Sequence, residues 1–346
     1  MNRQKSDDAF SRVKEITDQL EQGVKELFES QKYKDYLTTM SKFHSYSHNN
    51  IMLIFQQKPD ASLIAGYNAW KTEHGRQVRK GAKAIRILAP APYKVKVSRD
   101  KVNPDTDKPV LDENGNPVKE NVIVQQLAFK VVNVFDVSDT EGRELPSVGV
   151  NELSGDVERY EDFLGALKNI CLVPIEFDTI SSGAKGYFSL AENRIVINKG
   201  MQQVQTIKTV IHEISHQRLH SEGSPEFENK SRNSKEVEAE SVAFTVCQHY
   251  GIDTSDYSFA YIAGWSKGRE LSELKKSLDT IRKTASEVIN KIDGYMEELI
   301  KDRTTLSEKT EKTSVLGKLY TNNEIVRSRI SDNQEQNQAN RRQERS

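Results

Sequence analysis

The sequence lacks the features that mark secreted and membrane-spanning proteins. Only two cysteines occur in 346 residues, Cys171 and Cys247, and they form no CxxC pair. A disulfide framework or a thiolate metal site is therefore not expected. The longest apolar run is the five residues 51–55, whereas a spanning helix needs about 20. The first ten residues are polar and charged, so we predict a cytoplasmic protein with no membrane partner.

An excess of charge of one sign is also absent. Lys and Arg number 50 and Asp and Glu number 51, which gives a formal net charge of -1. This balance excludes a histone-like or supercharged chain but not a local basic face. Hydrophobic residues make up 36% and charged residues 29%, so part of the chain is expected to be a solvated tail.

The length and the residue patterns predict an α+β protein of two domains, since a domain holds roughly 150 residues. The predicted boundaries are 1–150 for the first domain, 151–303 for the second, and 304–346 for a polar, disordered tail. Apolar periodicity predicts helices at 9–43, 45–57, 157–170, 203–220 and 235–250, and a long amphipathic helix from residue 271. Enrichment in β-branched residues predicts strands within 78–97, 122–137, 173–177 and 194–198.

An HExxH motif, residues 212–216, lies inside one of the predicted helices. Residues four apart share a helix face, so His212 and His216 can bind one zinc ion while Glu213 reaches a water on it. Zinc lowers the pKa of such a water, and Glu213 would take its proton. His220 continues the four-residue spacing, and we place it behind the ligands rather than among them.

A third ligand is expected from the next predicted helix, which carries Glu236, Glu238 and Glu240. Glu236 and Glu240 are four apart and share a face, whereas Glu238 points elsewhere. We assign Glu236 as the ligand and Glu240 as the acceptor for an imidazole N–H. The choice between Glu236 and Glu240 as third ligand stays open.

This spacing resembles that of the gluzincin metallopeptidases, in which a glutamate follows HExxH after about nineteen residues. The stretch 183–198 together with the HEISH pentapeptide also resembles the zincin domains of ImmA-type and ArdC-type proteins. The resemblance implies a zinc metallopeptidase with one Zn2+ ion per chain and a protein substrate of unknown identity. It also implies that a strand beside the cleft pairs with an extended peptide, a role we give to residues 194–198.

A basic segment lies in the first domain. Residues 71–100 hold nine basic and two acidic residues, and such a stripe can neutralise phosphates. Aromatic residues nearby can stack on bases, although the same residues also suit a core under a solvated surface. The residues that we predict to bind DNA are Tyr46, Asn50, Trp70, Arg76, Arg79, Lys80, Lys83 and Arg86.

The amino-acid sequence of residues 43–50, 59–70, 75–90 and 134–142 closely resembles that of the N-terminal domain of ArdC-type antirestriction proteins. The resemblance spans roughly residues 10–300 and departs from that family at the loop 99–120, at Glu238 and in the C-terminal part. It implies binding of single-stranded DNA and protection of a mobile genetic element from restriction. Two alternatives remain: a single-stranded DNA-binding protein with a catalytically idle metal site, and an ImmA-type regulatory peptidase that cleaves a repressor.

Overall fold

The computed structural model describes residues 2–145, 157–221, 230–257 and 259–313, and it has the α+β composition expected from the sequence. Its helices are α1 (Asn2–Leu27), α2 (Ser30–Lys42), α3 (His48–Gln57), α4 (Tyr67–Thr72), η1 (Val137–Asp139), α5 (Val157–Ile170), α6 (Gln203–His220), α7 (Arg232–His249), α8 (Ile262–Ser266) and α9 (Leu271–Thr313). Its strands are β1 (Ile64–Gly66), β2 (Arg76–Val78), β3 (Ile85–Pro90), β4 (Tyr93–Asp100), β5 (Lys119–Gln126), β6 (Phe129–Asp136), β7 (Thr140–Gly142), β8 (Ile175–Asp178), β9 (Gly186–Ser189) and β10 (Arg194–Asn198). None of the helices within these ranges combines the length and the apolar character that crossing a bilayer requires.

The single helix predicted for residues 9–43 is in fact two helices, α1 and α2. The chain leaves the helical conformation at Glu29, whose backbone is extended (φ -96°, ψ 138°). Apolar residues of α1 at spacings of three and four, among them Ile16, Leu20 and Val24, are almost fully buried. The break was missed because the apolar periodicity runs on through it: Phe28 and Tyr33, on either side of the break, are also buried and stack on each other.

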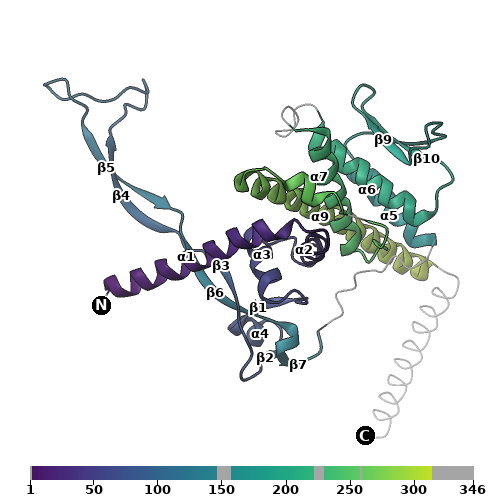
Figure 1. Ribbon diagram of the computed structural model, residues 1–346, viewed down its shortest axis with the longest axis horizontal. Helices are drawn as coiled ribbons and strands as arrows, with labels where there is room; N and C mark the ends of the chain where they lie inside the picture. Colours follow the sequence, from purple (N-terminus) through teal and green to yellow (C-terminus); the bar gives the residue numbers. More distant parts are fainter. Residues whose placement is uncertain (1, 146–156, 222–229, 258, 314–346) are drawn as a thin grey trace, which may run out of the picture. The chain divides into compact units, whose positions relative to one another are not determined.

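The N-terminal strands form three small antiparallel sheets. One has the strand order β1-β6-β3, and β2 pairs with β7. The loop predicted at residues 99–120 is the tip of the β4–β5 hairpin, which Figure 1 shows as a long two-stranded ribbon. Helix α3 packs on β3.

The metal-binding motif lies on a helical pair beside a second sheet. This sheet has the order β8-β10-β9, in which β10 is parallel to β8 and antiparallel to β9. Helix α6 packs on β9, β10 and α7. Gly186 permits the close approach of β9, since a Cβ there would lie 2.7 Å from the Thr209 methyl group of α6.

The N-terminal helices share a buried interface with α7. Helix α2 packs on α7, where the Tyr33 and Ser241 hydroxyls are 2.8 Å apart, and His249 Nδ1 lies 2.8 Å from the Ser41 carbonyl oxygen. One compact unit therefore comprises Met1–Tyr160 and Cys171–Ile289.

A second compact unit comprises, among the described residues, Glu161–Ile170 and residues 290–313, in which Arg303 forms two hydrogen bonds of 2.7 Å with Asp162. The domain boundary predicted at residue 150 lies outside the described residues. Helix α9 extends to Thr313, ten residues into the tail predicted from 304, and residues 314–346 lie outside the described part of the chain. The predicted domain limits remain a prediction.

Candidate metal centre and nucleic-acid interface

Helix α6 brings the two histidines of the HExxH motif together on one face. The four-residue spacing places the Nε2 atoms of His212 and His216 3.1 Å apart. Two nitrogen ligands of a tetrahedral zinc ion, each about 2.0–2.1 Å from it, lie roughly 3.3 Å from each other. The histidine pair thus has the spacing that one metal ion requires.

Helix α7 supplies the carboxylate that completes the set. Its N-terminus is capped by the Ser231 side chain, which accepts a hydrogen bond from the Ser234 N–H. One turn into the helix, Glu236 Oε2 lies 3.4 Å from His216 Nε2 and 3.7 Å from His212 Nε2. Among the described residues these three form the one group of His, Cys, Asp or Glu side chains close enough to hold a metal ion. Glu236, and not Glu240, is therefore the α7 carboxylate that lies with the two histidines.

Glu213 lies beside this group and is only 7% exposed. Burial raises the pKa of its carboxyl, although the neighbouring imidazoles His212 and His216 act in the opposite direction. A raised pKa brings a carboxylate closer to the range in which it can accept a proton and then return it. By contrast, hydrogen bonds from the two imidazoles hold the pKa of Glu236 well below its usual range.

The two remaining acids of α7 have different partners from those expected. Glu240 accepts a hydrogen bond from the Tyr261 hydroxyl instead of the imidazole N–H predicted for it. Glu238 was expected to point away from the site. It is fully buried, and its Oε2 lies at an ion-pair distance of 3.5 Å from His220 Nε2. His220 itself is behind the ligands, as predicted, with its Nδ1 3.1 Å from His216 Nδ1.

Two cavities meet at the candidate metal centre, and both are bordered by Gly186, His212 and Glu213. One, of about 410 Å³, also includes Lys208 and Glu240; the other, of about 640 Å³, includes Glu236 and the aromatic residues of β9.

The strand expected to pair with a peptide, residues 194–198, is β10. It lies in the middle of its sheet with both edges already hydrogen-bonded. Among the described strands, the sheet edge beside the cavities belongs to β9, which was not predicted as a strand.

Two residues predicted to bind DNA are structural instead. Trp70 is completely buried and its indole N–H donates to the Phe135 carbonyl at 2.9 Å. Asn50 is also buried, and its side-chain amide both donates to and accepts from the backbone of Leu88 at 2.9 Å, which fixes α3 to β3. Neither side chain can stack on a base or contact a phosphate without leaving the core.

The other predicted DNA contacts differ in their availability. Arg76 donates to the carbonyls of Thr140 and Arg143, and Arg86 pairs with Glu15 at 3.3 Å. Tyr46 is half-buried with its ring edge-on to Phe43, at a centroid distance of 6.1 Å. Lys80 and Lys83 are exposed, as is Arg79, which donates to the Ser138 carbonyl.

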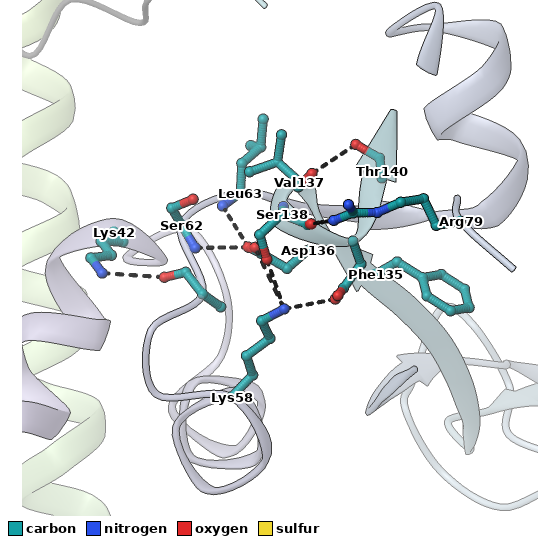
Figure 2. A network of polar contacts seen from close by, with 12 residues as sticks. Lys42, Lys58, Ser62, Leu63, Arg79, Phe135, Asp136, Val137, Ser138 and Thr140 are labelled. Carbon is teal, nitrogen blue, oxygen red and sulfur yellow. Dashed lines mark hydrogen bonds and ion pairs between the residues drawn. The ribbon is translucent and has the colours of Figure 1, made fainter. Parts of the chain in front are cut away.

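The position of Arg79 depends on a buried carboxylate, as Figure 2 shows. Asp136 accepts hydrogen bonds from the backbone N–H groups of Ser62, Leu63 and Ser138 at 2.8, 3.2 and 2.9 Å. Lys58 lies nearby and donates to the Ser138 hydroxyl at 2.8 Å. These bonds fix the turn whose carbonyl binds Arg79.

Exposed aromatic side chains lie at other positions on the same part of the chain. Tyr67 is 54% exposed, and Tyr93 and Phe129 are each 49% exposed. Tyr93 and Phe129 begin strands β4 and β6 near the base of the β4–β5 ribbon. Phe129 was missed because an aromatic residue at a strand end carries no sequence signal for exposure.

Comparison with known proteins identifies the N-terminal part. Residues 9–135 match the family described as the N-terminal domain of anti-restriction factor ArdC. An uncharacterized protein of Bacillus anthracis is 29% identical over 328 residues, which is 87% of this chain and 54% of that protein. The DNA primase TraC of Escherichia coli is 26% identical over 229 residues, 63% of this chain and 15% of the primase. The chain thus spans about half the length of the first relative and a small part of the second.

Two solved structures align with part of this chain. Both are crystal structures of the antirestriction ArdC protein from plasmid R388, one metal-free and one Mn(II)-bound. They are 20% and 17% identical to this chain, cover 73% and 72% of it and 84% of their own chain, and each aligns with a TM-score of 0.40.

Proposed function

From the premise that this chain is ArdC-like, with the ArdC N-terminal domain at residues 9–135, we propose a protein that binds single-stranded DNA and carries a zinc-dependent metallopeptidase site. Its role would be to protect the DNA of a mobile element from restriction. The observation that carries the enzymatic part is the meeting of His212, His216 and Glu236 beside the buried Glu213. Two imidazoles and one carboxylate, with an acid next to them, form the donor set of zinc peptidases.

The chemistry assigned to each residue follows from its position. A divalent cation held by His212, His216 and Glu236 would supply Lewis acidity to a water and a peptide carbonyl. Glu213 would accept a proton from the attacking water and pass it to the leaving amine, which its raised pKa favours. The free edge of β9 would hold an extended peptide by backbone hydrogen bonds along the cavities.

The metal assignment is tested by titrating the purified, chelator-treated protein with Zn2+ and, separately, with Mn2+. We expect one ion per chain and tighter binding of Zn2+, since imidazole ligands favour it. Glu236→Ala should lower the affinity at least tenfold, while Glu240→Ala should retain the metal. Wild-type affinity in Glu236→Ala would refute the ligand assignment.

The peptidase role is tested by Glu213→Gln, which preserves size and leaves the three ligands in place. We expect unchanged metal content and loss of proteolysis. If protection in a restriction assay survives this substitution, antirestriction depends on DNA binding, and the metal site plays no catalytic part in it. If instead the variant accumulates an uncut transcriptional repressor, the regulatory alternative holds.

Binding to single-stranded DNA is supported by the exposed lysines Lys80 and Lys83 and by the exposed rings of Tyr93 and Phe129. Replacing both lysines by alanine should reduce the slope of log affinity against log salt by about 1.4, since each phosphate contact on a single strand contributes roughly 0.7. Alanine at Tyr93 and at Phe129 should each cost about 1–3 kcal/mol where a base stacks. Lys199→Ala, on an exposed lysine beside β10, is the matched control. An unchanged slope in the double lysine variant would contradict this interface.

A further inference from the structure

A row of buried polar side chains runs from a candidate metal ligand into the core. His216 Nδ1 lies 3.1 Å from His220 Nδ1, and His220 Nε2 lies 3.5 Å from Glu238 Oε2. The other carboxylate oxygen of Glu238 accepts from Lys230 Nζ and from the Ser277 hydroxyl of α9, each at 2.5 Å. His220 is 4% exposed and Glu238 is 0% exposed, so both side chains are held by protein contacts and not by water at the surface.

When a metal is bound, the chemistry of imidazole determines which nitrogen of each histidine in this row donates a hydrogen bond and which accepts one. A histidine that binds a metal through Nε2 has its lone pair there and carries its proton on Nδ1. His216 must then donate from Nδ1, and His220 Nδ1 must accept. A neutral His220 that accepts at Nδ1 carries its own proton on Nε2, which faces Glu238. An ionised carboxylate only accepts, so Glu238 is the residue that makes this arrangement self-consistent.

We propose that His220 and Glu238 are positioning residues for the metal centre, which hold His216 in the tautomer that presents Nε2 to the ion. This inference rests on the proposed metal site and adds a role for a carboxylate two residues from the ligand Glu236. Lys230 and Ser277 hold the far oxygen of Glu238 and so fix which oxygen faces His220. Helix α9 thereby contributes to the geometry of a site formed by α6 and α7.

A purely structural role explains this row less well. A fully buried carboxylate carries a large desolvation cost, and apolar side chains of similar volume usually stabilise a core at least as well. A carboxylate or carbonyl behind a metal-binding histidine is instead a recurrent way to fix its ring and tautomer, and loss of such a partner lowers metal affinity about 10–100-fold. Here the partner acts through a second imidazole.

Glu238→Gln tests the inference because it reverses the direction of the row. The amide oxygen of Gln would face the ammonium group of Lys230, and its NH2 group would then face His220 Nε2. His220 would have to accept at Nε2 and donate from Nδ1, so that His216 Nδ1 becomes an acceptor and its proton moves to Nε2, the metal-binding atom. We expect metal affinity to fall at least tenfold for Zn2+.

The measurements are Zn2+ affinity by competition with a chromophoric chelator and the tautomers of His216 and His220 from ring 15N chemical shifts. Glu287→Gln is the matched control, since it makes the same exchange of carboxylate for amide at a residue that pairs with Arg218 of α6 at 2.5 Å; it should bind Zn2+ like wild type. Wild-type affinity in Glu238→Gln would overturn the inference. If that variant does not fold, His220→Phe decides, with the same tenfold loss expected and unchanged affinity as the refuting result. Failure of the wild-type protein to bind Zn2+ at all would instead refute the proposed metal site.

Discussion

The buried carboxylate of Asp136 offers a quantitative test of what stabilises the N-terminal part of the chain. Its two oxygens accept three backbone N–H groups, those of Ser62, Leu63 and Ser138 (Figure 2), and the residue is 1% exposed. Asp136→Asn keeps the shape of the side chain but replaces one acceptor oxygen by an NH2 group. Whichever way the amide lies, at least one backbone donor then faces another donor.

The cost of this substitution follows from two contributions. An unsatisfied buried N–H costs about 1–3 kcal/mol, and hydrogen bonds to a charged group are each worth about 1.5–3 kcal/mol, roughly twice the neutral value. Because Asn is neutral, the hydrogen bonds that its side chain still accepts are weaker than those of the carboxylate, which adds about 1–2 kcal/mol to the loss. We therefore expect the free energy of unfolding to fall by about 2–5 kcal/mol, a large part of the total for an ordinary domain.

The pH dependence identifies the cause. Burial alone would raise the pKa of Asp136, but its hydrogen bonds outweigh this effect and leave the pKa below the ordinary value of 3.8. A depressed pKa means that the stabilisation is fully present above pH 3.8 and is lost as the pH falls through the folded-state value. Urea unfolding of wild type and Asp136→Asn between pH 7 and pH 2.5 should show a constant gap that closes only below about pH 4. A gap below 1 kcal/mol at pH 7, or one that does not change with pH, would refute the reasoning.

Two further outcomes are expected. Trp70→Ala should destabilise the protein by about 3–5 kcal/mol because the ring is fully buried. Tyr67→Ala should change the free energy of unfolding by less than about 1 kcal/mol because the side chain is largely exposed. Thermal unfolding of both variants measures these losses, and a larger loss in Tyr67→Ala than in Trp70→Ala would contradict the burial assignment. Adding Zn2+ at about 100 times its dissociation constant should stabilise the chelator-treated protein by about 2.7 kcal/mol, with no such gain in Glu236→Ala, and an equal rise in Tm for both proteins would place the metal elsewhere.

Periodicity predicted most helices of this fold because burial and hydrogen bonding within one element depend on local sequence. Helices α5 and α6 and strand β10 match their predicted limits. The break between α1 and α2 was missed because it interrupts the backbone without interrupting the apolar pattern. Strand β9 was missed because Gly186 reads as part of a turn, whereas its small size is what allows the strand to lie against Thr209.

Several residues predicted for the nucleic-acid interface are buried or engaged elsewhere, because composition does not reveal burial. Trp70 and Asn50 look like a stacking ring and a hydrogen-bonding amide, but tertiary packing uses both to join elements of the domain. Arg76 is similarly engaged by backbone carbonyls. The exposed lysines and aromatic residues, which the sequence alone does not distinguish from these buried ones, remain as candidates for the proposed contacts with DNA.

Sequence spacing predicted part of the candidate metal centre but not all of it. The positions of His212, His216 and Glu236 follow from helical periodicity, but the role of Glu238 depends on how α7 crosses α6, which no local pattern specifies. If that crossing couples Glu238 to His220, the two residues should not act independently. Glu238→Leu, His220→Phe and the double variant form a double-mutant cycle. We expect the double variant to be more stable than the sum of the single changes predicts, by about 1–3 kcal/mol, since removing one residue deprives a buried polar atom of the other, Glu238 Oε2 or His220 Nε2, of its contact. Thermal or urea unfolding of the metal-free proteins measures this coupling. Additive effects would show that the 3.5 Å contact between the two side chains contributes nothing to the free energy of unfolding.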